Sequence, residues 1–445
     1  MDPYEALTRE QLLALVHAQT ASVTELQATL KRLEARIAEL ERRQEKGGPR
    51  GMPGLKPSPA PGRPAPEPRK PRAQGFARGR ATPTETVDHA LGRCPDCGTT
   101  LTGGWVKRTR EVLEITPTPA RVIEHRFLER ECPLCRTRRT PAVDLGERVL
   151  GRQRLGIGLI SLIVTLREVG RLPVRTIQAY LETVHQLHLS VGAITAASQR
   201  VAQVAADEVT ALRDQSRASP AVHADETGWR TAGHNGYIWT FSTPQARSVL
   251  HGRRTKDMVD TALGTAFDGV LCSDFYAAYT HYPGLKQRCW AHLLREIHDL
   301  QQIFPDDASL GTWAAAVHAL FLEARETLYP TPEQRARAAG RYRQRLLDLV
   351  RPVAADPDAP ARQLSARLER FIGDLFVFVT EPGVAPTNNL AERSLRPLVT
   401  RRKISGGSRS AAGTEATMVL ASLFGTWQLQ AQNPYTACRN LLSHV

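Results

Sequence analysis

The sequence predicts a multidomain α/β protein, and three observations lead to that fold class. The chain has 445 residues, too many for one ordinary hydrophobic core, so about three structural units are expected. Apolar residues near the N-terminus follow a heptad spacing, which predicts a coiled coil. After Pro220, stretches typical of strands alternate with helical ones, which predicts an α/β sheet.

Residues 1–46 are expected to form a coiled coil that makes the chain a homodimer or a higher homo-oligomer. One seam recurs there in alternating steps of four and three: Leu12, Val16, Gln19, Val23, Leu26, Leu30, Leu33, Ile37 and Leu40. Mostly β-branched residues at one seam position, with leucine at the other, favour a parallel two-stranded coil. A single amphipathic helix packed on the body of the protein is the alternative.

Residues 47–85 are predicted to be a proline-rich basic linker. The stretch at 47–72 contains nine prolines and almost no large apolar residue, so it cannot bury enough surface to fold. The net charge of the whole chain is +14 at pH 7, which favours a polyanionic partner such as double-stranded DNA. The linker is then a solvated spacer whose charge adds nonspecific contacts with DNA.

Residues 86–147 are predicted to be a zinc ribbon that binds DNA. Two Cys-x-x-Cys pairs, separated by 34 residues, supply four ligands for one structural Zn²⁺: Cys94, Cys97, Cys132 and Cys135. One tight turn provides only two thiolates of a tetrahedral shell, and the second turn completes it. The β-prone stretches at 105–116 and 120–129 are the expected strands. Redox dithiols or two unrelated turns are the alternatives.

Residues 148–215 are expected to be helical. Within them, residues 172–201 show two helices separated near 188–190, with Ser190 as the N-cap of the second. This pair is either a helix-turn-helix that contacts DNA or part of an ordinary core.

Residues 216–305 are predicted to begin an α/β domain, with strands at 221–225, 237–243, 246–252, 269–275 and 287–292 and a helix at 257–266. Residues 306–375 are rich in alanine, arginine and leucine and are expected to be helical throughout. Residues 376–445 complete the domain and add C-terminal helices.

No membrane association is expected. The longest apolar run, at 156–166, has 11 residues, short of the ~20 that a membrane helix needs. The first residues lack the basic and apolar regions of a secretory signal. A cytoplasmic location is therefore expected.

Three acids form a candidate metal site. Asp225 and Asp274 each end a predicted strand, and Glu392 stands among bases. Acids at the same ends of neighbouring strands can share a divalent ion, and a glutamate from a helix can hold a second one. Two Mg²⁺ ions held in this way can catalyse phosphodiester chemistry.

Simpler interpretations of these acids stay open. Acids at strand ends often cap the next turn, Glu226 competes with Asp225, and Asn389 and Glu392 have the spacing of a helix capping box. The bases beside Glu392 are expected to hold the DNA backbone: Arg393, Arg396, Arg401, Arg402 and Lys403.

Four ordered motifs resemble the large transposase of the IS66 family of bacterial insertion sequences: HADETGW at 223–229, CSDFYAAY at 272–279, CWAHLLREI at 289–297 and NNLAERSLRPLVTRRKISGGSRS at 388–410. The resemblance covers nearly the whole chain and implies an RNase H-like catalytic domain interrupted by a helical insertion. The 117 residues between Asp274 and Glu392 leave room for that insertion. Carried over position by position, the family's catalytic acids fall on Asp225, Asp274 and Glu392.

The resemblance implies a DDE transposase that uses two Mg²⁺ ions to cleave the ends of its element and to transfer the strands into target DNA. It also implies accessory proteins of the same element and a bacterial cytoplasmic location, at the nucleoid when the protein is bound to DNA. Two other functions stay open. One is a DNA-binding regulator whose catalytic fold is idle, and the other is a structure-specific nuclease.

Further residues in these motifs have open roles. Cys289 and His292 match a Cys-x-x-His feature of the family, but a second zinc site would need two more ligands. A buried strand cysteine beside a helix-capping histidine is the alternative. Gly406 and Gly407 are expected to let the loop after 405 approach a strand closely. Three tryptophans either stack on an unpaired base or belong to the core: Trp229, Trp239 and Trp290.

Overall fold

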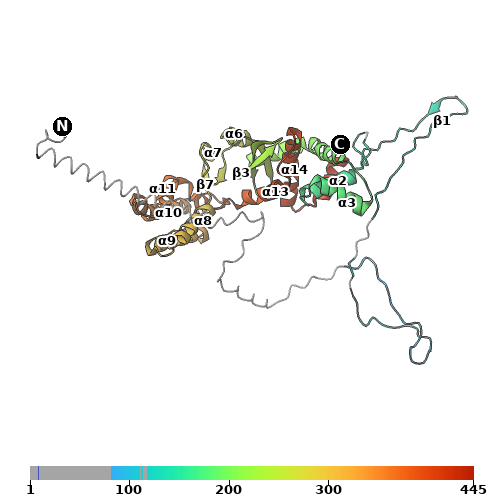
Figure 1. Ribbon diagram of the computed structural model, residues 1–445, viewed down its shortest axis with the longest axis horizontal. Coiled ribbons are helices and arrows are strands. Elements are labelled where there is room, and N and C mark those ends of the chain that lie inside the picture. The colour runs from blue at the N-terminus through green and yellow to red at the C-terminus, as the bar shows by residue number, and fades with distance from the viewer. Residues whose placement is uncertain (1–8, 10–81, 111, 114–117, 152, 445) are drawn as a thin grey trace, which may run out of the picture.

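The computed structural model describes residues 9, 82–110, 112–113, 118–151 and 153–444. The predicted coiled coil, apart from Arg9, and the linker as far as residue 81 lie outside the described residues. In the described part, helical bodies lie on either side of a central sheet (Figure 1). No helix of that part is both long enough and apolar enough to cross a bilayer.

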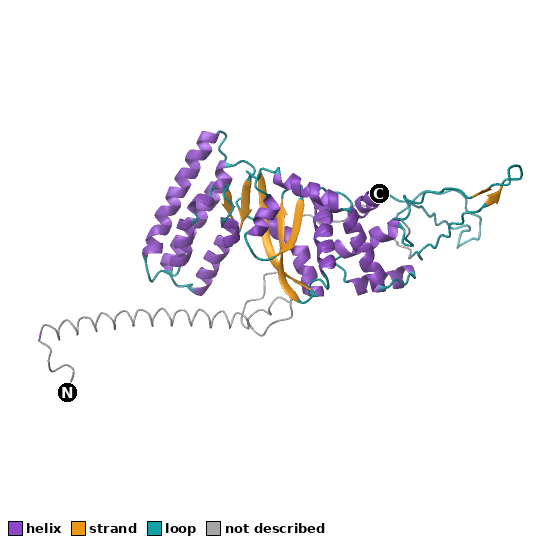
Figure 2. Cartoon of the chain, turned by 90° about the horizontal axis from the view of Figure 1, so that it is seen from above, coloured by secondary structure: helices purple, strands orange, loops and turns teal. Residues whose placement is uncertain are grey.

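The central sheet has five strands in the order β5-β4-β3-β6-β7. Figure 2 shows its strands in orange between the helical bodies. The strands are β3 (Ala221–Thr231), β4 (His234–Ser242), β5 (Arg247–Gly252), β6 (Val270–Ser273) and β7 (Lys286–Arg288). β3, β4 and β5 form an antiparallel meander, while β6 lies parallel to β3 on its other side and β7 lies parallel to β6. The first strand of the domain is thus the central strand of the sheet.

β3 is longer than the sequence predicted. The prediction that this strand ends at Asp225 is wrong, because β4 pairs with β3 from His223 to Thr231. The hairpin then turns at Ala232 and Gly233, whose φ angles are +49° and +87°. A two-residue hairpin loop of the favoured twist requires this left-handed conformation.

Helices cover both faces of the sheet. On one face, α6 (Asp257–Leu263) and α7 (Ala277–Thr280) pack with the fully buried Trp239 of β4. On the other face, α13 (Asn389–Ser405) and α14 (Ala411–Leu429) pack on the strands around Trp229. The three tryptophans singled out in the sequence are at most 2% exposed, so their interpretation as core residues is confirmed.

A second body is entirely helical. α2 (Ile157–Glu168), α3 (Val174–His185), α4 (Val191–Val204) and α5 (Ala206–Arg217) share a core with α14 and α15 (Pro434–Ser443). The two helices predicted within 172–201 are confirmed as α3 and α4, and the Ser190 hydroxyl accepts the N–H of Ala193 at 3.1 Å as the N-cap of α4. Because α14 also covers the sheet, it joins the two bodies.

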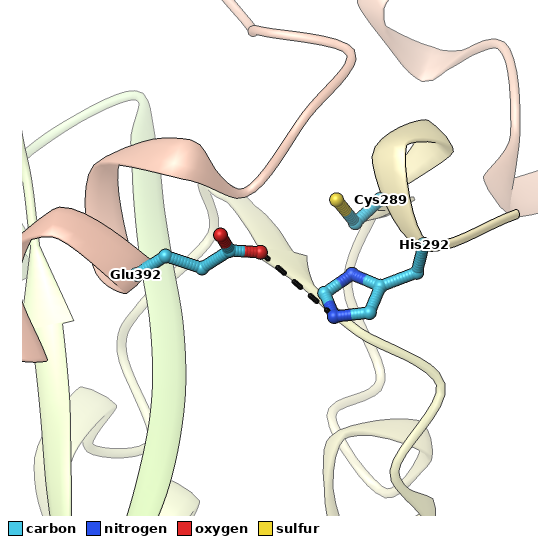
Figure 3. Close-up of side chains that lie close together, drawn as sticks. All are labelled: Cys289, His292 and Glu392. Carbon is cyan, nitrogen blue, oxygen red and sulfur yellow. Dashed lines mark ion pairs between the residues drawn. The ribbon is translucent and has the colours of Figure 1, made fainter. Parts of the chain in front are cut away.

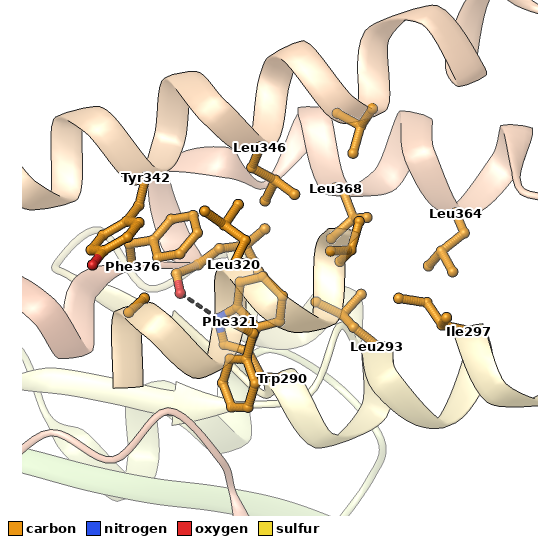
Figure 4. Packing of buried hydrophobic residues seen from close by; sticks show 14 of the residues in the cluster. Trp290, Leu293, Ile297, Leu320, Phe321, Tyr342, Leu346, Leu364, Leu368 and Phe376 are labelled. Carbon is orange, nitrogen blue, oxygen red and sulfur yellow. Dashed lines mark hydrogen bonds between the residues drawn. The ribbon is translucent and has the colours of Figure 1, made fainter. Parts of the chain in front are cut away.

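The segment between β7 and α13 forms a helical lobe. It contains α8 (Trp290–Ile303), α9 (Ala308–Glu326), α10 (Pro332–Ala355), α11 (Arg362–Arg370), η1 (Ile372–Asp374) and α12 (Val377–Thr380). In its core, the ring of Trp290 contacts the rings of Phe321 and Phe376 (Figure 4). The prediction that 306–375 is helical is confirmed for most of the segment, whose helices are joined by connections such as those at 327–331 and 356–361. The strand predicted at 287–292 is wrong beyond Arg288, because α8 begins at Trp290 and packs into this core.

Candidate functional site

Asp225 and Asp274 lie beside each other on neighbouring parallel strands. β3 and β6 pair in register up to His223 and Cys272, and two residues further along each chain stands an aspartate. Asp225 is still inside β3, whereas Asp274 directly follows the last residue of β6. The two acids predicted from the sequence therefore lie side by side at the C-terminal end of β6.

Burial and like charge raise the pKa of the Asp225 carboxyl to about 7. Burial is the largest cause, and the negative charges of Glu226, Asp274 and Glu392 add to it. The N–H of Glu226, which donates to Asp225 Oδ1 at 2.9 Å, opposes the shift. These carboxylates need a counter-charge, and oxygen ligands of this kind suit Mg²⁺. The residues present therefore fit a magnesium site.

Glu226, the competitor of Asp225, is engaged by other side chains. Its carboxylate is buried and accepts hydrogen bonds from Arg254 Nε at 3.0 Å and from the Tyr279 hydroxyl at 2.6 Å. As the next residue in a strand, it points to the opposite face from Asp225. Both oxygens of Glu226 already have partners, which leaves Asp225 to face Asp274.

Glu392 lies in the first turn of α13 and does not cap it. The N-cap of this helix is Asn388, not Asn389, and no side chain makes a cap hydrogen bond, so the capping-box interpretation is wrong. Oε1 of Glu392 is buried and has no hydrogen-bond partner among the described residues. It lies 3.8 Å from Nε2 of His292.

Asn388 fastens the start of α13 to the sheet. Its Nδ2 donates to the carbonyl of Ala224 at 2.7 Å, its Oδ1 lies 3.3 Å from Nδ1 of His223, and its backbone N–H donates to Sγ of Cys289 at 3.1 Å. Burial lowers the pKa of His223 to about 4, so the neutral ring can donate its Nδ1–H to Asn388. These contacts hold Glu392, one turn later, next to β3.

The sequence did not single out Asn388 or His223 for any role. Both belong to the motifs around the acids, at the beginning of NNLAERS and of HADETGW. That position was the only signal for them, because a hydrogen bond between residues 165 positions apart leaves no local pattern.

The five bases after Glu392 divide into two groups. Three are exposed: Arg393, Arg396 and Lys403. The other two are partly buried and bound within the protein. Arg401 pairs with the buried carboxylate of Glu168 in α2 at 2.8 Å, and Arg402 donates to Thr227 Oγ1 of β3 at 2.9 Å. The exposed group is available to a DNA backbone, whereas the bound group holds α13 in place.

The close approach predicted for the glycines after α13 is confirmed. Gly406 ends the helix with φ +72°, and Gly407 follows with φ +114°. A Cβ on Gly407 would lie 2.2 Å from the carbonyl oxygen of Arg230. That carbonyl accepts the N–H of Ser408 at 2.8 Å, so the loop adds to the edge of the β3–β4 hairpin.

The four ribbon cysteines occupy two turns of the same geometry. The N–H of Cys94 donates to the carbonyl of Thr99, and the N–H of Cys132 donates to that of Thr137, each at 2.9 Å. The residue after the second cysteine of each pair has a positive φ, +73° in the first turn and +55° in the second. Each turn therefore presents its two thiols in the same way.

The ribbon itself differs from the prediction. The strands predicted at 105–116 and 120–129 are wrong over the described residues of those stretches, which are almost all exposed and form no strand. Instead, β1 (Arg130–Glu131) and β2 (Arg138–Arg139) pair around the second turn. Strands need a packed partner. The two cysteine turns do not bring their sulfurs together, because these sulfurs are absent from the metal-ligand groups found among the described residues.

One group of potential metal ligands does come together in the described part of the chain. Cys289, His292 and Glu392 each offer one atom, and these three atoms lie within 4.8 Å of one another (Figure 3). Cys289 is buried as expected, but it is the N-cap of α8, not a strand residue, and no side chain caps that helix. The expected pairing of a strand cysteine with a capping histidine is therefore wrong.

Two matches to known families agree with this geometry. Residues 152–416, more than half of the chain, match the Transposase IS66 family, and residues 92–136 match the zinc-finger binding domain of transposase IS66. No curated protein matches the chain. The first match contains the three acids, and the second contains both cysteine turns and supports zinc binding. The chain belongs to the IS66 transposase family.

Proposed function

We propose that this transposase cleaves DNA at the ends of its insertion sequence in a Mg²⁺-dependent reaction and then joins the freed 3′ ends to target DNA. The observation that carries the proposal is the convergence of Asp225, Asp274 and Glu392 from two parallel strands and a helix fastened to them. The order of the strands, an antiparallel meander extended by two parallel strands, supports an RNase H-like catalytic domain.

The chain's own residues divide the work of this reaction. Asp225, Asp274 and Glu392 are the ligands for the ions, and Asn388 keeps the first turn of α13 on β3. When bound, two Mg²⁺ ions activate the attacking oxygen, first of water and then of the 3′ end, and stabilise the leaving oxygen. Arg393, Arg396 and Lys403 hold phosphates of the DNA backbone through charge-assisted contacts.

The parts outside the catalytic domain bind DNA and pair two transposase chains. A zinc ribbon at 86–147 with one structural Zn²⁺ adds further DNA contacts, and a coiled coil at 1–46 pairs two chains. Pairing suits a reaction on two DNA ends, since each chain then supplies one site.

The decisive experiment compares Asp225→Asn, Asp274→Asn and Glu392→Gln in Mg²⁺-dependent nicking and joining of end-containing DNA. Each variant removes a negative charge and an anionic ligand, so both steps should slow by about 100-fold or more. End binding should change little, and the melting temperature should not fall. Glu226→Gln is the matched control, because it removes a neighbouring charge whose oxygens face Arg254 and Tyr279.

The outcomes separate the alternatives. If Glu392→Gln is the one variant that cleaves at the wild-type rate, Glu392 is not a ligand of the catalytic ions. Specific binding without nicking by the wild-type protein would favour a regulator with an idle fold. Nicking without joining would favour a structure-specific nuclease.

A further inference from the structure

Cys289, His292 and Glu392 come from two elements that meet beside the candidate magnesium site. Cys289 is the N-cap of α8 and is 1% exposed, His292 lies in the first turn of the same helix, and Glu392 lies in the first turn of α13. Figure 3 shows the thiol, the imidazole and the carboxylate pointing toward one another. The catalytic proposal uses neither Cys289 nor His292.

Two atoms of this group are shielded from solvent and make no hydrogen bond within the described residues: Nδ1 of His292 and Oε1 of Glu392. The nearest opposite charge to Oε1 of Glu392 is Nε2 of His292, at 3.8 Å. Burying a polar atom without a hydrogen bond is unfavourable. A cation bound to these two side chains and to the thiol would offset that cost.

The sulfur of Cys289 is held in place by the start of α13, because it accepts the backbone N–H of Asn388 at 3.1 Å. Cysteine binds metal as the thiolate.

The donor set selects the kind of metal. Thiolate, imidazole and carboxylate are the three ligands of zinc sites in proteins, whereas Mg²⁺ takes oxygen ligands only. Bond lengths of ~2.0–2.3 Å place two ligands of a tetrahedral zinc ion roughly 3.3–3.7 Å apart. The present separations are up to 4.8 Å, so shifts of about 1 Å would close the site. Three protein ligands leave the fourth position to water.

We propose that Cys289, His292 and Glu392 form a second transition-metal site, for an ion such as Zn²⁺, and that its occupation holds the transposase inactive. Binding releases the thiol proton of Cys289 to solvent. The bound ion withdraws Glu392 from Asp225 and Asp274 and ties α8 to α13. The inhibition rests on the proposed function, whereas the metal site does not.

Cobalt titration of the full chain tests the site without any activity measurement. The background carries Cys94→Ser and Cys132→Ser, so that the ribbon binds no metal. About one equivalent of Co²⁺ should then bind and give a sulfur-to-cobalt charge-transfer band. Cys289→Ser should abolish the band, and His292→Gln, at a partly exposed position, should weaken binding more than ~10-fold. Cys438→Ser, at a buried cysteine of another core, should keep the band.

Either of two results would overturn the site: no band in the background, or a band that survives Cys289→Ser. If Cys289→Ser does not fold, the His292→Gln titration decides by the same criterion, since unchanged affinity in that variant excludes the imidazole as a ligand.

Zinc inhibition tests the role of the site. Each protein is compared with its own zinc-free rate of Mg²⁺-dependent nicking. The Zn²⁺ concentration that halves this rate should be more than ~10-fold higher for His292→Gln than for wild type. Equal values would refute the inhibition. A wild-type protein that never nicks would refute the proposed function instead, and the cobalt titration would still decide the site.

Discussion

At the scale of single residues, the Asp225 carboxyl makes the stability of the metal-free protein depend on pH. Its pKa of about 7 in the folded state lies above the usual value of 3.8. Between those two pH values the folded protein keeps a proton that the unfolded chain has lost. The stability contributed by this group is therefore complete below about pH 4 and is lost as the pH rises to 7.

Asp225→Asn should remove this pH dependence in the metal-free protein. At pH 8 the variant should be more stable than wild type by up to about 4 kcal/mol, from roughly three pH units at 1.36 kcal/mol each. At pH 4 the difference should vanish. Chemical denaturation in chelator at both pH values measures it. A variant no more stable than wild type at pH 8 would show that burial and the neighbouring carboxylates do not raise the pKa of Asp225.

The residues that carry charge could be predicted from the sequence, and those that hold them in place could not. Asp225 and Asp274 each follow a short apolar stretch typical of a strand, and Glu392 stands among bases, which are local patterns. Asn388 and His223 act through contacts across the fold. Arg401 and Arg402 were expected on DNA because their partners in α2 and β3 are far away in the sequence.

At the scale of elements, α13 is fixed at both ends. Asn388 fastens its start to β3, and the loop at Gly407 fastens its end to the same strand through Arg230. The positions of most strands and helices along the chain followed from periodicity in the sequence. The length of β3 did not, because its partner β4 determined where the strand ends.

Gly407→Ala should cost more stability than Gly406→Ala. Both glycines have positive φ, which costs an alanine about 1–2 kcal/mol. Only Gly407 also faces a backbone oxygen, 2.2 Å from where Cβ would stand, while Gly406 has nothing within 4 Å. We expect about 3 kcal/mol or more for Gly407→Ala. Equal unfolding free energies for the two variants would show that the loop does not rest on β3.

At the scale of the whole molecule, the described chain divides into a part with hydrophobic cores and a part without one. None of the described residues from 82 to 149 is buried, whereas the sheet, the α2–α5 body and the helical lobe each have a core. The Cys-x-x-Cys spacing predicted the two turns. No local sequence pattern predicted which distant helices share a core. An example is α14, which packs both on the sheet and in the core of the α2–α5 body. A segment without a core can take its folding free energy from a bound metal ion.

Zinc should therefore fold residues 86–147 without stabilising the rest. In wild-type protein with Zn²⁺, hydrogen exchange in this segment should be slow. In the variant with Cys94→Ser and Cys132→Ser it should be fast, with about one equivalent less zinc bound. The melting temperature of the remaining domains should stay unchanged. Unaltered zinc content in the variant would remove the four-cysteine site.

The helical lobe also separates the synthesis of the first two acids from that of the third. Glu392 follows Asp274 by 118 positions, and the chain between them builds the lobe. A ribosome that adds ~5–20 residues per second needs roughly 6–24 s to make this stretch. The lobe, whose helices contact their neighbours in sequence, folds fast once it has emerged. Asp225 and Asp274 are therefore synthesised well before Glu392, which is added with α13. A chain whose synthesis stops within the lobe has no Glu392, and so it lacks the third carboxylate on which the proposed DNA cleavage depends.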